Sequence, residues 1–270
     1  MTSYAIISSN KDNASKNIKQ ALIESYRFTE SEEIFEQQNV FKKDNLKIYT
    51  TNNELVYLEN VDKYIDADYF VFASKHQSKS KIPSLTVHSI GNWGIAELGG
   101  KDSTLVSSSA LLQRDLFLNL NKFSQSFNYE VVNEATHHGP FLKKPSIFIE
   151  IGSSDKEWND KNIAFIVAKV IIETLKSDRN KASIAVGIGG LHTCSNFNRI
   201  ILKNNVAIAH FCAKHSLNSL NKEMIKEALN KTIERVDFLL LDWKGLKSEK
   251  QRILNEINEL RIEYKRTDNF

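Results

Sequence analysis

The sequence predicts an α/β protein, a three-layer α/β/α sandwich with a mixed, mostly parallel sheet. Two observations predict this fold class. Short runs of β-branched and aromatic residues recur along the chain, and amphipathic helical patterns lie between several of them. Many of the runs are apolar throughout, which is typical of strands that other elements cover on both faces.

The predicted strands are spread over most of the chain. In order, they are Tyr4–Ser8, Leu46–Thr50, Leu55–Leu58, Tyr69–Ala73, Ser84–His88, Tyr129–Val132, Ile147–Ile151, Ile184–Ile188, Val206–Ala209 and Phe238–Leu241. Each is short and rich in the residue types that favour a pleated, buried conformation.

The clearest predicted helix covers Asn162–Leu175, because Ile163, Ile166, Val167, Val170 and Ile171 form one apolar stripe at helical spacing. Upstream, Ser154-Asp155-Lys156-Glu157 has the spacing of a capping box and predicts a short helical turn. The remaining predicted helices are Ser15–Phe28, Ser107–Phe123, Lys222–Val236 and Lys250–Tyr264. These helices are expected to pack on the sheet.

Length and composition describe an ordinary globular chain. Its 270 residues are 41% hydrophobic and 26% charged, with three prolines, so a substantial core is expected. We find no repeat, low-complexity tract or linker. The prediction is therefore one large α/β domain over residues 1–270, either a single unit or two lobes that share one core.

Charge and cysteine content exclude some function classes. The net charge of +3 does not by itself indicate a nucleic-acid binder, although clustered lysines could still attract phosphates. Two cysteines exclude a disulfide framework and a CxxC metal site, and they suit a reducing compartment. The N-terminal residues lack the pattern of a signal peptide, and no apolar stretch approaches a bilayer span of about 18 residues. A cytoplasmic protein without a membrane partner is expected.

All but one of the seven histidines follow or close a predicted strand. These are His76, His88, His137, His138, His192 and His210. In open α/β sheets, ligands bind beyond the carboxyl ends of the strands. If the strands are parallel, these imidazoles lie along one edge of the sheet.

The pair His137-His138 is the strongest functional candidate, because Gly139-Pro140 ends the strand and the turn presents both rings. A single histidine within an apolar run is more often a packing residue, and this interpretation is favoured for His88 and His210. For His215, a capping or surface position is favoured.

Two carboxylates accompany the histidines. Glu134 lies three residues before His137, and Glu150 interrupts the apolar run IFIEIGSS. A buried charge is costly unless it is paired. Glu150 is therefore a candidate to orient an imidazole, bind a metal or pair with a lysine, unless its strand is an edge strand facing water. Imidazole and carboxylate ligands suit zinc, but no HExxH spacing is present.

Several polar segments allow two interpretations. Gly187, Gly189 and Gly190 do not fit GxGxxG; their amides could bind an oxyanion, or they form a tight turn. Ser153, Ser154 and Thr136 are conceivable nucleophiles, but the GxSxG motif is absent. Lys75, Lys79 and Lys81 lie around His76 in the sequence. They form either a solvated loop or a phosphate-binding site. Trp243, beside Lys244, is a core residue or a platform for a base.

In these segments the chain resembles the D-aminoacyl-tRNA deacylase family of the archaeal and plant type. The matching stretches are SKHQSKSKIPSLTVHSIGNWG (74–94), EATHHGP (134–140), FIEIGSS (148–154), GIGGLH (187–192), AIAH (207–210) and LDWKGLK (241–247). The resemblance implies a zinc-dependent monomer with a phosphorylase/hydrolase-like fold. It also implies hydrolysis of the ester between a D-amino acid and the 3′ end of tRNA, and removal of mischarged glycine. Thr193 stands where the family usually has an aromatic residue.

The resemblance and the strand-end positions together suggest roles. His137 and His138 would form the metal or base centre, with His76, His88 and His192 as further ligands or proton carriers. Glu134 and Glu150 would orient imidazoles, and Glu150 is also a candidate ligand. Lys75 and Lys244 would meet the terminal phosphates of tRNA, and the remaining substrate contacts would come from Lys79, Thr136, Gly189 and Gly190.

Two other functions fit parts of the pattern. A metal-dependent peptidase or amidase acting on small substrates would use the same histidines, and its rate would be insensitive to moderate salt. A non-catalytic RNA-binding module would retain tRNA and release no amino acid. Binding of tRNA should weaken steeply as salt rises.

Overall fold

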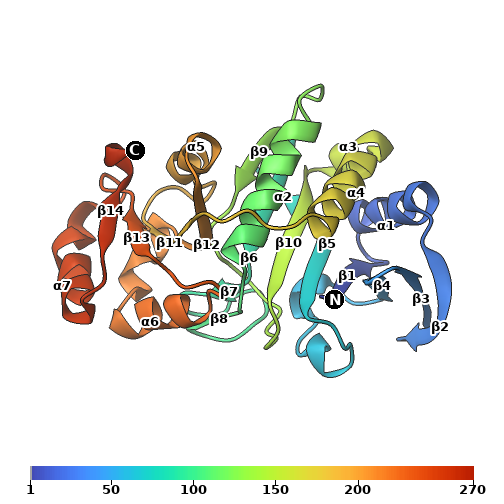
Figure 1. Cartoon of the computed structure of the whole chain (residues 1–270), viewed down its shortest axis with the longest axis horizontal. Coiled ribbons are helices and arrows are strands. Elements are labelled where there is room, and N and C mark those ends of the chain that lie inside the picture. Colours follow the sequence, from blue (N-terminus) through green and yellow to red (C-terminus); the bar gives the residue numbers. More distant parts are fainter. Residues whose placement is uncertain (1) are drawn as a thin grey trace.

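The structure is a computed structural model that describes residues 2–270. Its larger sheet has eight strands in the order β2-β3-β4-β1-β5-β10-β6-β9 (Figure 1). Their bounds are β1 Tyr4–Ser9, β2 Thr29–Phe35, β3 Gln38–Lys43, β4 Leu46–Thr51, β5 Tyr69–Gln77, β6 Ser84–Ser89, β9 Glu130–Asn133 and β10 Ser146–Ser153. Strands β4, β1, β5 and β10 run parallel, whereas β6 pairs antiparallel with β10 and parallel with β9.

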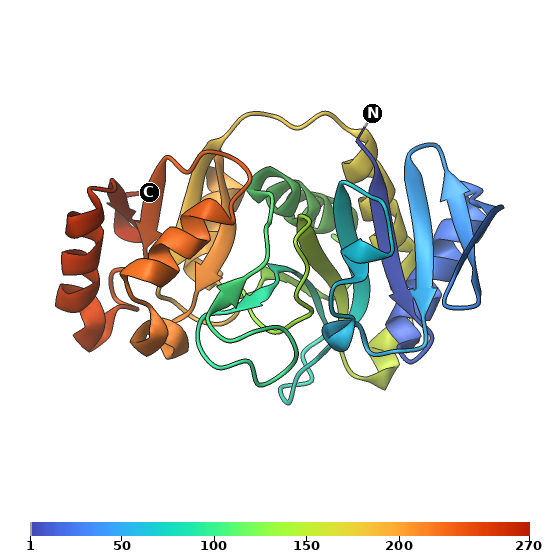
Figure 2. The ribbon, with the colours of Figure 1, turned by 90° about the horizontal axis from the view of Figure 1, so that it is seen from below.

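A second sheet has four parallel strands in the order β12-β11-β13-β14. They cover β11 Ser183–Ile188, β12 Val206–Cys212, β13 Phe238–Leu241 and β14 Tyr264–Arg266. The short strands β7 (Gly91–Asn92) and β8 (Thr104–Leu105) pair with each other beside the two larger sheets (Figure 2).

Helices cover both sheets. They are α1 Asn13–Tyr26, α2 Ala110–Phe123, α3 Asp155–Trp158, α4 Lys161–Lys176, α5 Ser195–Lys203, α6 Lys222–Asn230 and α7 Lys250–Leu260. On the larger sheet, α1, α2 and α4 bury one face, where Ile18 and Val167 join the core formed with Ile149. On the smaller sheet, α6 and α7 pack on one face and α5 on the other. The predicted α/β class with a mixed, mostly parallel sheet is confirmed.

The second face of the larger sheet carries shorter elements. The 3-10 helices η1 (Leu55–Tyr57) and η2 (Val61–Lys63) cover the end of this face nearest β1 and β5. The predicted strand Leu55–Leu58 is therefore wrong. Leu55 and Leu58 are buried while Tyr57 is 51% exposed, and burial at a spacing of three suits a helical turn rather than a strand.

The structure also contains elements that the sequence analysis did not predict, and one predicted helix ends earlier than expected. The β2–β3 hairpin was not predicted; its turn residues Glu36 and Gln37 both have positive φ, at 44° and 62°, without a glycine. Helix α5 was also missed. The predicted helix Lys250–Tyr264 ends at Leu260, because Arg261 adopts a left-handed conformation and Tyr264 begins β14. The predicted capping box of Ser154 and Glu157 is present at α3.

Candidate active site

Three neighbouring strands of the larger sheet turn polar side chains onto the face that η1 and η2 partly cover. In register, Ser74 of β5 pairs with Glu150 of β10, which pairs with Thr86 of β6. Paired residues project from the same face, and Oγ1 of Thr86 donates to Oε2 of Glu150 at 3.1 Å. His76 and His88, each two residues further along its strand, share this face.

The predicted common edge of parallel strands is wrong. Because β6 runs antiparallel to β10, the carboxyl end of β6 lies at the opposite end of the sheet from that of β5. His76 and His88 still approach Glu150, with ring nitrogens 3.7 and 3.6 Å from Oε2. The imidazoles therefore meet over the face of the sheet and not along one edge.

The segment 134–138 connects the two sheets. On one side, the amide of Glu134 donates to the carbonyl of Val87 in β6 at 3.0 Å. On the other side, the amide of Ala135 donates to the carbonyl of His192 at 2.7 Å, and the amide of Thr136 donates to the carbonyl of Phe211 in β12 at 3.0 Å. This segment places Glu134, His137 and His138 where the sheets meet.

Three imidazoles are oriented by backbone carbonyls. Nδ1 of His88, His137 and His138 lies 3.1, 2.7 and 2.6 Å from the carbonyl oxygens of Ser89, Ala135 and Gly139, respectively. If each Nδ1–H donates to its carbonyl, Nε2 keeps a free lone pair. One ring nitrogen from each of the three residues lies within 4.8 Å of the others. His138 is also held at a positive φ of 45°, a conformation that a non-glycine residue adopts at some energetic cost.

Glu134 lies at the centre of the cluster and is almost fully buried. Its Oε1 is 3.3 Å from Nε2 of His192, and its Oε2 is 3.2 Å from Nδ1 of His76. Burial raises the pKa of Glu134, but the imidazoles of His192 and His76 outweigh burial and hold the pKa well below its usual value. Glu134 is therefore an anion at neutral pH.

The imidazoles differ in their charge. Burial lowers the pKa of His76, yet the carboxylates of Glu134 and Glu150 outweigh it and raise the pKa to about 10. Burial and the neighbouring His88 lower the pKa of His138 to about 4, and the same causes hold the pKa of His137 well below its usual value. One cationic imidazole thus lies close to two neutral ones.

His88 and Glu150 form a second buried contact. Burial lowers the pKa of His88, and Glu150 outweighs this effect and raises it. Burial likewise raises the pKa of Glu150, whereas His76 and His88 lower it. A cation at this position would compete with the proton on Nε2 of His88, since a metal ligand must be deprotonated.

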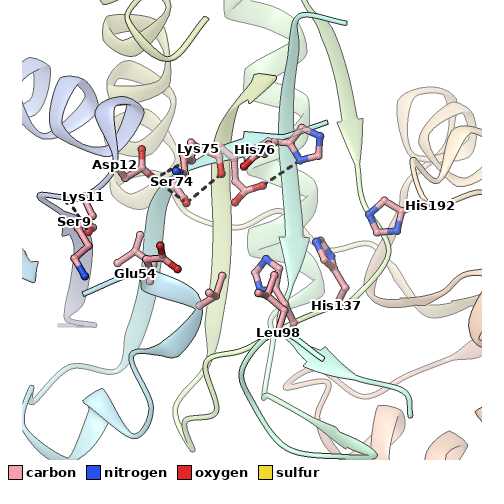
Figure 3. A pocket seen from close by; sticks show the side chains of 15 residues that line it. Ser9, Lys11, Asp12, Glu54, Ser74, Lys75, His76, Leu98, His137 and His192 are labelled. Carbon is pink, nitrogen blue, oxygen red and sulfur yellow. Dashed lines mark hydrogen bonds and ion pairs between the residues drawn. The ribbon is translucent and has the colours of Figure 1, made fainter. Parts of the chain in front are cut away.

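Two cavities meet at this cluster. The first, of about 430 Å³, is lined by Ser9, Lys11, Asp12, Glu54, Leu55, Val56, Ser74, Lys75, His76, Gln77, Leu98, His137, His138, Glu150 and His192 (Figure 3). The second, of about 450 Å³, is lined by Gly91, Asn92, Trp93, Gly94, Ile95, Glu97, Leu98, Thr136, His137, His138, His192, His215, Ser216, Asn218 and Ser219. Both volumes fall in the usual range of ligand sites.

The other predicted substrate residues are dispersed. Lys75 lines the first cavity and Thr136 the second, whereas Lys79 is exposed in the loop after β5 and lines neither. Lys244 lines a separate cavity of about 130 Å³ together with Trp243 and Arg199. The structure therefore does not bring Lys75 and Lys244 into one cavity.

The glycine turn packs tightly against its surroundings. Gly189 and Gly190 have φ of 93° and 83°, and a Cβ on either would lie 3.0 Å from an atom of Asp242. The amide of Gly189 donates to the carbonyl of Cys212 at 2.7 Å. Neither glycine lines the two cavities at the histidine cluster. These contacts favour the tight-turn interpretation.

The remaining polar candidates have structural partners. Ser153 donates to the carbonyl of Ile82, and Ser154 donates to Glu157. His210 is buried, in keeping with a packing role, while His215 is exposed, with its ring centroid 5.7 Å from that of His192.

Sequence reasoning missed the first-cavity residues Ser9, Lys11 and Asp12, and also Glu54 and Leu98. The first three close or follow β1, so the strand-end rule that selected the histidines could also have found them. Nothing in the local sequence indicates that Leu98 would lie against the histidines.

The donor set fits a zinc ion. Nε2 of His88 is buried without a hydrogen bond, and such an atom is costly unless it is paired. Three groups of closely spaced donors are present: His88, His137 and His138; Glu134, His137 and His192; and His76, Glu134 and Glu150. The first group offers three imidazoles with oriented rings, which is the ligand chemistry that zinc prefers once Nε2 of His88 has lost its proton.

A buried imidazole–carboxylate cluster that opens into cavities of ligand size, on a rigid α/β platform, defines a hydrolase-type active site. The comparisons with known proteins agree. The family model described as D-aminoacyl-tRNA deacylase matches residues 63–265. The chain belongs to the D-aminoacyl-tRNA deacylase family.

Relatives match over nearly their whole length. A D-aminoacyl-tRNA deacylase of Thermococcus kodakarensis is 38% identical over 268 residues, which are 96% of this chain and 98% of that protein. One from Archaeoglobus fulgidus is 31% identical, over 94% of this chain and 92% of that protein. A crystal structure of a conserved protein of unknown function aligns with a TM-score of 0.92 and 30% identity, and covers 99% of this chain and 96% of that one.

Among the described residues 2–270, the helices are too short or too polar to cross a bilayer.

Proposed function

We propose that this protein hydrolyses the ester bond between a D-amino acid and the 3′ end of tRNA. The relatives that match nearly the whole chain carry the name of this activity. The observation that carries the proposal is the contact of Glu134 with His192 at 3.3 Å. His192 lines both cavities. This arrangement suits an ester, because the amino acid and the nucleotide that the ester joins could each occupy one cavity.

His192 is suited to activate the attacking water. If its Nε2–H donates to Oε1 of Glu134, Nδ1 remains free to accept a proton. The anionic Glu134 orients the ring and stabilises the imidazolium that forms, as the carboxylate does in a catalytic triad. The side chain of His192 is 39% exposed, so both water and substrate can reach it.

His76 is suited to stabilise negative charge. It is held as an imidazolium beside Glu134 and Glu150, and it lines the first cavity. A fixed cation near the ester carbonyl favours the charge that develops on its oxygen in the transition state. Its elevated pKa keeps this charge in place throughout the neutral range.

A zinc ion belongs to this proposal, with His88, His137 and His138 as its ligands. When bound, zinc supplies Lewis-acid polarisation of a carbonyl oxygen and of a water molecule. The backbone carbonyls at the three Nδ1 atoms support the arrangement, because a proton on each Nδ1 would leave Nε2 free to act as a ligand.

The proposal extends to the substrate and the setting. The tRNA end would be met by lysines, with Lys75 in the first cavity, and mischarged glycine would be a second substrate. We also propose that the protein acts as a monomer in the cytoplasm without an obligate protein partner, which molar-mass measurement by light scattering tests.

The decisive experiment is incubation of the purified protein with D-tyrosyl-tRNA and L-tyrosyl-tRNA, each with and without a zinc chelator. Release of D-tyrosine, with L-tyrosyl-tRNA left intact and with activity lost on chelation, supports the proposal. Hydrolysis of neither ester contradicts the activity. If hydrolysis is undiminished in chelator and zinc is shown to have been removed, the proposed role of zinc is contradicted, while the proposed activity is not.

A further inference from the structure

The two cavities share one wall, formed by Leu98, His137, His138 and His192. We call it the histidine wall. Since these are the residues that face both cavities, a ligand that occupies both must pass them. Under the proposed function, which this inference depends on, the substrate also has two halves, an amino acid and a terminal nucleotide, joined by the ester to be broken.

Leu98 is the one residue of the histidine wall that is not a histidine, and backbone hydrogen bonds of its segment hold it in place. The amide of Gly139 donates to the carbonyl of Leu98 at 2.9 Å, and the amide of Gly100 donates to Oε1 of Glu59 at 2.7 Å. Gly99 approaches so closely that a Cβ there would lie 2.0 Å from the carbonyl oxygen of Val56. Leu98 is therefore held beside the turn that follows His138, and Figure 3 shows it among the residues that line the first cavity.

The two cavities differ in charge. The first is lined by Lys11 and Lys75, whose positive charges suit the phosphodiester that every terminal nucleotide carries. Of the described residues that line the second, none is a lysine or an arginine. A nucleic-acid end is thus favoured in the first cavity.

The first cavity also holds the carboxylates of Asp12, Glu54 and Glu150, so the preference rests on the positions of Lys11 and Lys75 and not on a net positive charge. Asp12 already accepts hydrogen bonds from the amides of Ser15 and Lys75, and Glu150 faces His76 and His88. Glu54 is exposed and can accept hydrogen bonds from ribose hydroxyls.

The second cavity suits an amino-acid side chain. Trp93, Ile95 and Leu98 offer apolar contact, while Asn218 and Ser219 add neutral polar groups. Ile95 is 80% exposed, so its side chain is free to contact a ligand in this cavity. The combination fits side chains from methyl to phenol size.

We infer that the 3′-terminal nucleotide occupies the cavity of Lys11 and Lys75, that the D-amino-acid side chain occupies the cavity of Trp93 and Ile95, and that the ester lies at the histidine wall. The second cavity then sets the range of amino acids accepted. His192, which faces both halves, lies at the bond.

The test uses two size-graded substrates, D-tyrosyl-tRNA and D-alanyl-tRNA, and two matched variants. Asn218→Trp adds an indole to the second cavity and Gln77→Trp adds one to the first, each at an exposed position. We expect Asn218→Trp to lower the ratio of kcat/KM for D-tyrosyl-tRNA over D-alanyl-tRNA by at least about tenfold. We expect Gln77→Trp to change both values by the same factor.

Ile95→Ala provides a second, mild variant at an exposed position. It should lower the ratio about threefold or more, because the larger side chain loses more apolar contact. Thermal unfolding of each variant verifies that it is folded. The assignment is overturned if the ratio shifts in Gln77→Trp and not in Asn218→Trp, or if it stays unchanged in both Asn218→Trp and Ile95→Ala. A wild-type protein that releases neither amino acid contradicts the proposed function instead.

Discussion

The hydroxyl of Thr136 lies between the amide of Phe211 and the imidazole of His210. Oγ1 accepts from the Phe211 amide at 3.0 Å and lies 3.3 Å from Nδ1 of His210. Nε2 of His210 in turn lies 3.3 Å from the carbonyl of Lys231. Every member of this buried series of hydrogen bonds has a partner if His210 is neutral with its proton on Nε2. The hydrogen bonds hold Thr136, the residue directly before His137, in place.

Replacing Thr136 by valine should destabilise the protein by about 1–3 kcal/mol, because the Phe211 amide and Nδ1 of His210 lose their buried partner. Urea unfolding at pH 7.5 measures this change. The matched control is Thr193→Val, whose side chain is exposed and should change stability by less than about 0.5 kcal/mol. Equal stability of the two variants would show that the hydroxyl contributes nothing.

Acid should destabilise the protein through His210. Burial lowers its pKa to about 4, whereas the unfolded imidazole titrates near 6.5. Above pH 6.5 both states are neutral, and between pH 6.5 and 4 the unfolded state binds the proton. Stability should therefore fall as the pH drops through this window, by about 2 kcal/mol at pH 5. In His210→Gln, the difference in unfolding free energy between pH 7.5 and pH 5 should be smaller by that amount. An unchanged difference would contradict the assignment.

Removal of the central carboxylate should impair catalysis. Glu134→Gln should lower kcat/KM by about 10²-fold or more, since His192 loses the anion that orients it. It should also lower the pKa of His76, which NMR titration measures. The control is Glu130→Gln, at the exposed start of β9, the strand that leads to Glu134. It should stay within about threefold of the wild type. A Glu134→Gln enzyme of equal activity would rule out the dyad.

Loss of one imidazole should release zinc. His138→Ala should lower zinc affinity by more than the roughly 10- to 100-fold that loss of an outer-sphere partner costs. Mass spectrometry of the metal content measures this independently of activity. His215→Ala is the control, because His215 lies near His192 but in none of the donor groups. Full zinc content in His138→Ala would contradict the proposed ligand set.

Salt dependence should identify the lysine that meets tRNA. Lys75→Ala should reduce the slope of log KM against log salt by about 1, the value for one lost phosphate contact. Lys176→Ala, a control whose ammonium pairs with Asp44, should leave the slope unchanged. An unchanged slope in Lys75→Ala would show that this lysine does not contact a phosphate.

The sequence predicted the strands that carry the site, since each is a compact apolar run. Glu150 was found because a carboxylate inside such a run has to be paired, and the structure surrounds it with His76, His88 and Thr86. The pair His137-His138 was found because a strand stopped by Gly-Pro turns its next side chains into a loop.

The sequence could not predict strand direction. Composition alone does not distinguish a parallel from an antiparallel neighbour, so the expectation of one shared edge, which required parallel strands, did not hold for His88 on β6. The hairpin β2–β3 escaped detection because Glu36 and Gln37 adopt a turn usually built with glycine. Leu98 reaches the site through a long-range hydrogen bond with Gly139, for which local periodicity gives no signal.

The connection of both sheets by residues 134–138 has a consequence for the newly made chain. Ala135 bonds to His192 and Thr136 to Phe211, so these contacts close only after the ribosome has released most of the polypeptide. A nascent fragment that has folded its first sheet would hold His76, His88 and Glu150 but lack the base. The site would thus be complete only when nearly the whole chain has left the ribosome.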